Sequence, residues 1–444
     1  RGFDVAYFDS TDWTGPEVGT ATFRDGRILH FDRVPGVSNM RSFSFRATST
    51  FTPVVDGDHI LTLVQAGRAR LLVDGQVVVD GIAQPMPLGE EFFGMGSAEA
   101  DAAVPMVAGR PVEVTVEWTS EGAAFISGAK VGVRTPSPDD LMDRAVAAAT
   151  EADVVVLVVG TNHDWETEGR DRESMDLPGD QPELIRRVCA ANSDTVVVVN
   201  AGSVVTSDWA DVAPAVLQTW FGGQEMADAL VDVLVGDDEP SGRLPTTVPH
   251  RLQDTPAFLH YPGENGRVVY GEGLFTGYRW YDARDLPVAF PFGHGLGYTE
   301  FSWGEPSLGE VPTVADLESG ATLLVTVPVT NVGDRAGSEV VQCYVAPLAP
   351  RLTRPVRELQ GFAKVRLEPG ESADVVVGLG HRAFAYWDPG DPGQSQRSSR
   401  SPVAAGQGMA SRDEPGWHID PGSCELHIGP SSADIRAIIP LDLQ

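Results

Sequence analysis

An uninterrupted apolar run from Val154 to Val159 is the feature that most limits how this chain can fold. A continuous run of β-branched residues, rather than an alternating one, is typical of a strand buried on both faces. A helical pattern over Pro182 to Ala191 and a second apolar run over Thr195 to Val199 follow it. Strands and helices that alternate at this spacing predict a parallel sheet with helices on both faces.

The sequence on either side of this region has a different pattern. Before it, short alternating segments surround Asp74-Gly75, a strong hairpin signal, and predict a β-sandwich. After it, runs such as Leu323 to Val329 predict a second sandwich. We therefore expect a multidomain α/β plus β protein. Its predicted parts are a β-sandwich module over 1–134, an α/β sandwich domain with a mostly parallel sheet over 135–299, and a fibronectin-III-like β-sandwich over 300–444 with a disordered loop over 393–415.

Composition excludes several classes of protein. The chain has 444 residues, 42% of them hydrophobic, so it can bury several cores. No stretch approaches the roughly 18 apolar residues of a membrane-spanning helix, and no membrane partner is expected. With 32 basic and 63 acidic residues, a net charge of -31, the chain should repel the phosphates of nucleic acid. Neutral small molecules and sugars remain open as ligands.

The cysteines and histidines give no sign of a metal or of cross-links. Cys189, Cys343 and Cys424 are odd in number and widely spaced, and they form no C-x-x-C motif. We expect buried core thiols rather than a disulfide framework or a zinc ribbon. His163 and His294 are not paired at metal-ligand spacing, so no metal and no cofactor is predicted.

The first residues do not resemble a secretion signal. The chain opens with Arg1, and Phe3, Val5 and Tyr7 alternate as they would in a strand. We expect a fragment or processed piece of a longer protein. Arginine-rich, lysine-poor composition suggests a bacterial source, and both a cytoplasmic and a secreted location stay open.

The segment from Gly160 to Arg172 directly follows the first apolar run. It holds four acids, a histidine, a tryptophan and two arginines. In open α/β sheets, ligands bind beyond the carboxyl ends of the strands. The segment is therefore either a solvated acidic loop or the source of a proton-donating carboxylic acid beside the aromatic wall of Trp165. Sugar chemistry uses an acid of this kind near an apolar surface.

Thr167 to Arg172, followed by Met175 to Gly179, resembles the E-G-x-D-R…L-P loop of glycoside hydrolase family 3. Further motifs follow in the family's order through the C-terminal sandwich. They cover Asn200 to Val204, Trp220 to Glu225, Pro240 to Pro249, Tyr270 to Tyr281, Pro291 to Thr299, Val329 to Gly337 and Arg357 to Phe362.

The resemblance implies a β-glucosidase-like enzyme that hydrolyses a terminal, non-reducing β-linked glucose or a related sugar with retention. It implies that this chain supplies the general acid/base and that an N-terminal (β/α)8 barrel, absent from the chain, supplies the nucleophile. Glu168 is the expected acid/base and Glu166 the second candidate. Asp208, in Ser207-Asp208-Trp209, is interpreted as a coincidental match to the barrel's nucleophile motif. The alternative is a non-catalytic carbohydrate-binding or structural fragment.

The remaining candidate residues would contact the small carbohydrate or glycoside substrate. Trp165 and His163 lie in the acidic loop, where Arg172 either contacts substrate or pairs with a neighbouring carboxylate. The first 134 residues are similar to the protective-antigen-type module that some β-glucosidases of this family carry inserted in the α/β domain. Phe92 and Phe93 of this module are either core residues or a loop that stacks on the sugar.

Overall fold

The computed structural model describes residues 2–168, 171–390 and 415–444. The predicted loop over 393–415 lies outside these ranges except for its last residue. The chain forms two compact units, one of residues 1–147 with 166–171 and one of residues 148–165 with 172–444. Among the described residues, no helix combines the length and hydropathy that crossing a membrane requires.

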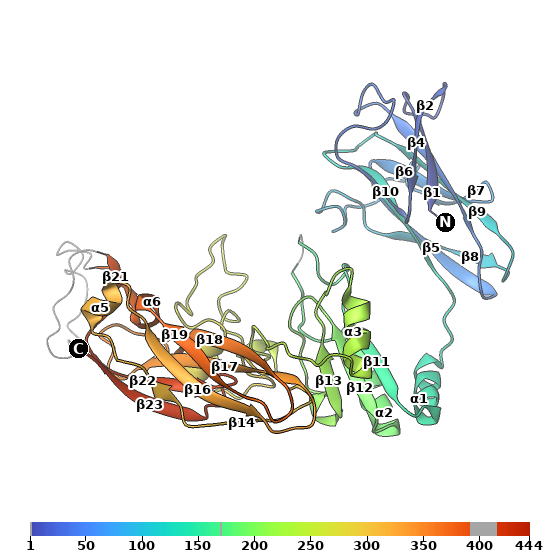
Figure 1. Cartoon of the computed structure of the whole chain (residues 1–444). Coiled ribbons are helices and arrows are strands. Elements are labelled where there is room, and N and C mark those ends of the chain that lie inside the picture. The colour runs from blue at the N-terminus through green and yellow to red at the C-terminus, as the bar shows by residue number, and fades with distance from the viewer. Residues whose placement is uncertain (1, 169–170, 391–414) are drawn as a thin grey trace. The chain divides into compact units, whose positions relative to one another are not determined.

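The first unit is a sandwich of two antiparallel sheets (Figure 1). One sheet has the order β2-β1-β4-β9-β6-β7 and the other the order β3-β10-β5-β8. The strands are β1 (Phe3–Phe8), β2 (Glu17–Phe23), β3 (Arg27–His30), β4 (Ser44–Phe51), β5 (Gly57–Ala66), β6 (Arg68–Val73), β7 (Gln76–Asp80), β8 (Ala100–Met106), β9 (Val112–Thr119) and β10 (Ser127–Arg134).

Aromatic residues fill the space between these sheets. Trp118 stacks on Phe45 with ring centroids 5.0 Å apart, and both side chains are fully buried. The predicted hairpin is confirmed: Asp74 and Gly75 join β6 to β7, and both have the positive φ that a tight two-residue turn requires. The predicted alternation of buried and accessible side chains holds for β6, whereas β5 and β9 bury side chains on both faces over most of their length.

One carboxylate is nearly buried in the larger sheet of this sandwich. Glu117 of β9 accepts hydrogen bonds from Arg46 (2.9 and 2.7 Å) and Arg70 (2.7 Å) on the two neighbouring strands. Burial by itself would raise the pKa of Glu117, but the hydrogen bonds and charges of both arginines outweigh burial and hold this pKa below its ordinary value.

The second unit begins with the predicted α/β region. Strands β11, β12 and β13 pair in parallel, in that order. The side chains of Ile185, Val188 and Cys189 on α2 are buried, at the three- and four-residue spacing that places them on one face. The elements of the α/β region are α1 (Leu141–Glu151), which spans the boundary between the two units, β11 (Val155–Gly160), α2 (Gln181–Ala191), β12 (Thr195–Asn200), η1 (Ala210–Val212), β13 (Ala215–Gln218), α3 (Met226–Val235), η2 (Leu252–Asp254) and α4 (Tyr278–Arg284).

The expectation that the Val154–Val159 run is buried on both faces is wrong. Val159 belongs to a hydrophobic cluster with residues of α2 and β12, but Val156 and Val158 on the opposite face are 47% and 57% exposed. β11 lies at the edge of the sheet, and in this chain no helix covers its outer face as the predicted arrangement requires. This statement applies to the described residues alone.

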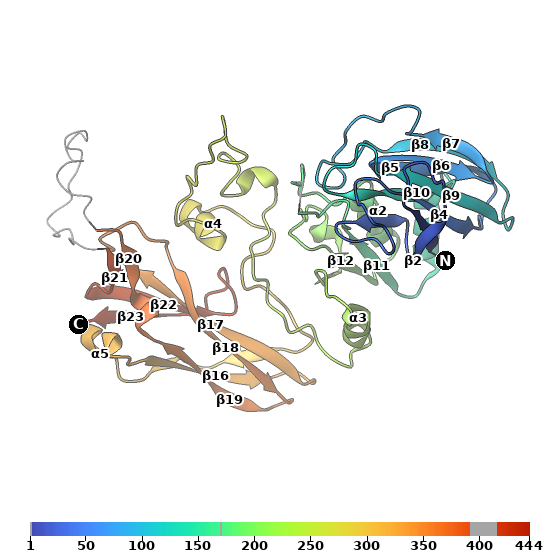
Figure 2. The same ribbon diagram turned by 90° about the horizontal axis from the view of Figure 1, so that it is seen from above.

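The C-terminal part of the second unit is the expected β-sandwich (Figure 2). In one sheet, β16 pairs with β14, β15 and β19. The other sheet has the order β18-β17-β22-β23. The strands and helices are β14 (Phe301–Trp303), β15 (Ser307–Leu308), α5 (Val314–Glu318), β16 (Leu323–Asn331), β17 (Gly337–Pro347), β18 (Glu358–Leu367), β19 (Ser372–Leu379), α6 (His381–Phe384), β20 (Tyr386–Asp388), β21 (Gly416–His418), β22 (Gly422–Gly429) and β23 (Ala437–Leu443).

The cysteines lie in the hydrophobic cores, as predicted. Cys343 and Cys424 belong to the core of the C-terminal sandwich and Cys189 to the core beneath α2. All are free thiols, and burial raises the pKa of Cys424 to about 11. None of them has the lowered pKa of a reactive thiolate.

We predict that Glu117→Gln destabilises the first sandwich by about 1–3 kcal/mol at neutral pH, because two arginines lose their charged acceptor. The folded-state pKa of Glu117 is lowered, so its contribution is full above the unfolded pKa of about 4.3 and is lost as the pH falls through the folded value. The difference between wild type and Glu117→Gln should therefore shrink on acidification. Urea unfolding at a series of pH values measures it.

Glu113→Gln is the matched control, because Glu113 lies on the same strand with an exposed side chain. A pH dependence of unfolding that is the same in Glu117→Gln and wild type would contradict the assignment.

Candidate active site

The acidic loop starts at a fixed point where β11 ends. Gly160 has a φ of +157°, and a Cβ there would lie 1.9 Å from the carbonyl oxygen of Asn200, so only glycine fits. The side-chain amide of Gln181 accepts from the Gly160 N–H (2.7 Å) and donates to its carbonyl (3.0 Å). The Thr161 N–H donates to Asn200 O on the neighbouring strand (3.1 Å). The loop therefore leaves the sheet in one defined direction.

The first residues of the loop form a tight turn. The side chain of Asn162 accepts from the Asp164 N–H (2.9 Å), and the Trp165 N–H donates to Asn162 O (3.0 Å). His163 lies 3.1 Å from Asp164, with its side chain 61% exposed. The Trp165 side chain is 44% exposed, so its ring is accessible to a ligand. Both predicted residues are thus held by the turn rather than by a core.

The two candidate acids come next and belong to a different unit. Glu166 is half-buried and Glu168 is exposed. The contacts of residues 166–171 group them with the first unit, whereas Trp165 and Arg172 on either side belong to the second. The seven predicted residues therefore divide into two sets, Glu166, Glu168, Phe92 and Phe93 in the first unit and His163, Trp165 and Arg172 in the second.

Arg172 connects two loops at the carboxyl edge of the parallel sheet. Its Nη1 donates to Ser203 Oγ (2.7 Å) and to Val204 O (3.2 Å), in the loop that follows β12. The Nε and Nη2 atoms are shielded from solvent and have no acceptor among the described residues. A guanidinium with unused donors can bind a carboxylate or a hydroxyl group.

Two further polar groups at this edge were missed by the sequence analysis as site residues. Asn200 Oδ1 at the end of β12 and Gln218 Nε2 at the end of β13 are buried and lack a hydrogen-bond partner within the described ranges. Buried polar atoms without partners are uncommon and call for an explanation. Their position at the ends of consecutive parallel strands was a usable signal, because that edge is where such sheets bind ligands.

Phe92 and Phe93, in one loop of the first sandwich, lie in different surroundings. Phe92 packs into a small hydrophobic cluster with Ile126, whereas Phe93 is 63% exposed. Both have left-handed backbone conformations, with φ of 56° and 59°. Bulky residues adopt such angles at a cost of about 1–3 kcal/mol each, so the surrounding contacts must hold them there. The core interpretation thus applies to Phe92, and only Phe93 is available to a ligand.

Contacts on both sides of this loop explain how it is held. The Gly94 N–H donates to Glu90 O (3.1 Å), and the Gly96 N–H donates to Glu91 O (2.9 Å). Lys130 of β10 forms an ion pair with Glu91 (2.8 Å). A Cβ on Gly96 would lie 2.7 Å from the Phe92 ring, so a larger residue there would displace the buried aromatic anchor.

Other candidate positions have structural roles. Asp208 forms an exposed ion pair with Arg186 of α2 (2.5 Å). His294 stacks on Phe290, and burial together with the charge of Arg243 lowers its pKa. Within the described ranges, no group of three or more His, Cys, Asp or Glu side chains is arranged to hold a metal ion.

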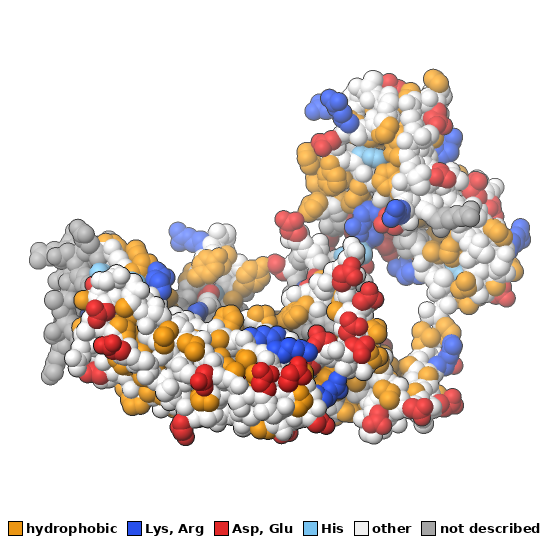
Figure 3. Space-filling model, viewed as in Figure 1, with side chains coloured by type: hydrophobic (Ala, Val, Ile, Leu, Met, Phe, Trp, Pro, Cys, Tyr) orange, Lys and Arg blue, Asp and Glu red, His pale blue; other side chains and the backbone are white. Residues whose placement is uncertain are grey.

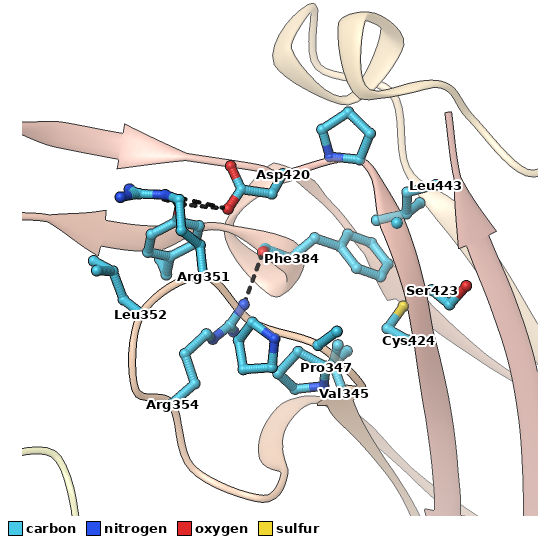
Figure 4. A pocket seen from close by; sticks show the side chains of 15 residues that line it. Val345, Pro347, Arg351, Leu352, Arg354, Phe384, Asp420, Ser423, Cys424 and Leu443 are labelled. Atoms are coloured by element: carbon cyan, nitrogen blue, oxygen red, sulfur yellow. Dashed lines mark hydrogen bonds and ion pairs between the residues drawn. The ribbon is translucent and has the colours of Figure 1, made fainter. Parts of the chain in front are cut away.

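A pocket of about 270 Å³ lies in the C-terminal sandwich and contains none of the seven predicted residues (Figure 4). Its polar groups largely satisfy one another. Arg351 contacts Asp388 and Asp420, and the Tyr386 hydroxyl donates to Asp420 (2.5 Å). Phe384, Cys424 and Leu443 line its apolar side. The pocket is a feature of the sandwich itself, separate from the residues at the carboxyl edge of the parallel sheet.

The parallel α/β sheet with its acidic loop and the β-sandwich that follows both match family models. Residues 56–298 match the glycosyl hydrolase family 3 C-terminal domain, and residues 339–432 match the fibronectin type III-like domain. The first match covers more than half of the chain, and the chain belongs to glycosyl hydrolase family 3.

Individual relatives agree with this assignment. A β-glucosidase of Rhizobium radiobacter is 41% identical over 99% of this chain and 51% of the relative. The crystal structure of a Kluyveromyces marxianus β-glucosidase in complex with glucose superposes with a TM-score of 0.86 at 33% identity, over 100% of this chain and 50% of that one. A Streptomyces venezuelae β-glucosidase in complex with D-glucose gives 0.60 at 29% identity, over 90% and 46%. The chain thus spans about half the length of these relatives.

We predict that Arg172→Gln loosens the connection between the two loops at the sheet edge. Loss of this partly buried charged donor should cost about 1 kcal/mol and increase amide hydrogen exchange in residues 201–206. Ser203→Ala should give a smaller effect in the same segment, because Val204 O still binds the guanidinium.

Arg186→Gln is the control for the loss of an arginine, since its exposed ion pair contributes about 0–1 kcal/mol. If exchange in residues 201–206 is unchanged in Arg172→Gln, the arginine does not hold the two loops together.

Proposed function

We propose that this chain is the part of a retaining β-glucosidase that supplies the general acid/base. The proposal rests on one observation: a family 3 chain carries its carboxylate-rich loop directly beyond the carboxyl end of β11, where α/β sheets bind ligands. In this proposal the nucleophile belongs to an N-terminal (β/α)8 barrel in the half of the relatives that the chain does not span.

Retaining hydrolysis needs two carboxyl groups about 5–5.5 Å apart. The acid protonates the leaving-group oxygen while the nucleophile attacks the anomeric carbon, which gives a covalent glycosyl-enzyme. The same residue, now a carboxylate, then takes a proton from the water that releases the sugar. Glu168 is our candidate for this residue, because it directly precedes the Gly169-x-Asp171-Arg172 motif, and Glu166 is the second candidate. No cofactor takes part in this chemistry.

Substrate contacts are proposed for the accessible residues around the acid. The exposed Trp165 ring offers an apolar wall to a sugar face, and His163 is accessible beside it. The unused donors of Arg172 would bind a sugar hydroxyl or orient a carboxylate of the loop. Phe93, on a sandwich we interpret as a protective-antigen-type module, would stack beyond the bond that is cleaved, with Phe92 as its anchor.

The proposed substrate is a terminal β-linked glucose or a closely related sugar. Support comes from the relatives, which are named β-glucosidases, and from two structural relatives described in complex with glucose. The net charge of -31 is in keeping with a neutral rather than an anionic substrate.

Without the barrel, the 444-residue chain should not hydrolyse aryl β-glucosides above the buffer rate, because it lacks the nucleophile. Release of nitrophenol from a nitrophenyl β-glucoside measures this. Turnover that disappears in Asp208→Asn would contradict both the division of roles and the structural interpretation of Asp208.

In the enzyme completed with its barrel, Glu168→Gln should reduce turnover of poorly activated glycosides by about 10²–10⁴-fold. A dinitrophenyl glucoside, whose leaving group departs without a proton, should lose little in the glycosylation step. Azide, which needs no general base, should restore turnover of that substrate and give a β-glycosyl azide. Steady-state kinetics and product analysis measure both effects.

Glu166→Gln is the matched control, because it removes a carboxylate from the same loop. If Glu166→Gln alone shows leaving-group dependence and azide rescue, the acid/base is Glu166. If neither variant shows them, the acid is not on this loop and the proposal fails.

A further inference from the structure

The segment from Thr255 to Gly277 of the second unit, called the arm below, exposes an unusual amount of apolar surface. Its most exposed large side chains are Leu259 and Tyr270, both 82% exposed. Val269, Leu274, Tyr261 and Val268 follow at 64%, 60%, 54% and 50%. Hydrophobic side chains gather on this projecting segment in Figure 3, beside a basic side chain. Contiguous exposed apolar patches on soluble proteins usually mark an interaction site.

The arm has a defined conformation, which separates it from a loosely structured loop. At its tip, Glu264 and Arg267 exchange two backbone hydrogen bonds of 3.0 Å around Asn265 and Gly266, which both have positive φ. This is the geometry of a tight hairpin turn. At its base, the indole N–H of Trp280 donates to Asp254 O (2.9 Å). The apolar side chains are therefore presented on a braced hairpin.

A partly buried acid on the arm has one carboxylate oxygen without a hydrogen bond among the described residues. Glu272 Oε2 is shielded from solvent and accepts no hydrogen bond within the described ranges.

We infer that the arm is the docking surface for the other half of the enzyme, the barrel of the proposed function, on which this inference rests. The Kluyveromyces marxianus relative matches this whole chain at a TM-score of 0.86, and the match covers only 50% of that protein. The other half of that relative is therefore about as long as the part that matches this chain and its arm. A domain of that size is a sufficient occupant for an apolar hairpin, and in a single polypeptide it is present at high effective concentration.

The test compares side-chain accessibility in two proteins, this chain alone and a chimera that joins to it the half of the Rhizobium radiobacter relative that this chain does not cover. Hydroxyl-radical labelling of Leu259 and Tyr270 should fall about tenfold in the chimera, because core interface residues are almost fully buried. Exposed apolar residues of the C-terminal sandwich, Leu348 and Ile438, are 55% exposed each and should label equally in both proteins.

A double variant of the chimera, Leu259→Ser with Tyr270→Ser, tests whether the apolar side chains themselves hold the arm. Labelling of Val268, Val269 and Leu274 should rise severalfold in this variant. The matched control, Leu348→Ser with Ile438→Ser, should leave arm labelling unchanged. Comparable labelling of the C-terminal sandwich in all variants shows that the fold is kept.

The outcomes separate this inference from the proposed function, because hydrolysis of a nitrophenyl β-glucoside by the chimera is measured independently. A protected arm supports the docking surface even if the chimera is inactive, which would instead contradict the proposed function. An arm labelled equally in an active chimera overturns the inference alone. Protection that appears in the isolated chain with increasing concentration identifies a second copy as the occupant and also overturns it.

Discussion

The parallel pairing of β11 with β12 is the interaction on which the candidate site depends. The register runs from Val155 opposite Thr195 to Gly160 opposite Asn200, so both strands end at the same edge. Parallel strands need a crossover, and here α2 provides it and covers one face of the sheet. The loops after the two strands consequently meet, which allows Arg172 in one to bind Ser203 in the other.

Local sequence patterns were sufficient to predict strands and turns, but not to predict which faces of a strand are covered. The Val154–Val159 run correctly predicted a strand, because β-branched residues favour extended backbone in any context. Whether both faces of that strand are covered depends on segments far away in the sequence or outside it, and the exposed Val156 and Val158 could not be foreseen. The Asp74-Gly75 turn was predictable because its left-handed backbone is a local requirement.

The candidate site was predictable only in its general position. Alternation of strands and helices indicated the edge of the sheet, and motif resemblance indicated the acidic loop. Residue roles were harder to foresee, since an irregular loop has no period that assigns side chains to a face. Nothing in the sequence Phe92-Phe93 distinguishes the buried ring from the exposed one. The same holds for Asn200 and Gln218, whose unsatisfied atoms become visible only once the strands are aligned.

The braced conformation of the loop that carries Phe93 has a consequence for the kinetics of recognition. Because Phe92 anchors the loop and backbone hydrogen bonds close it, the backbone that carries the exposed ring is in one conformation before any ligand arrives. The entropic cost of ordering this loop is part of the free energy of folding. Binding of a ligand therefore does not incur that cost again. A ligand that stacks on Phe93 should then associate in a single step, without waiting for a minor conformation.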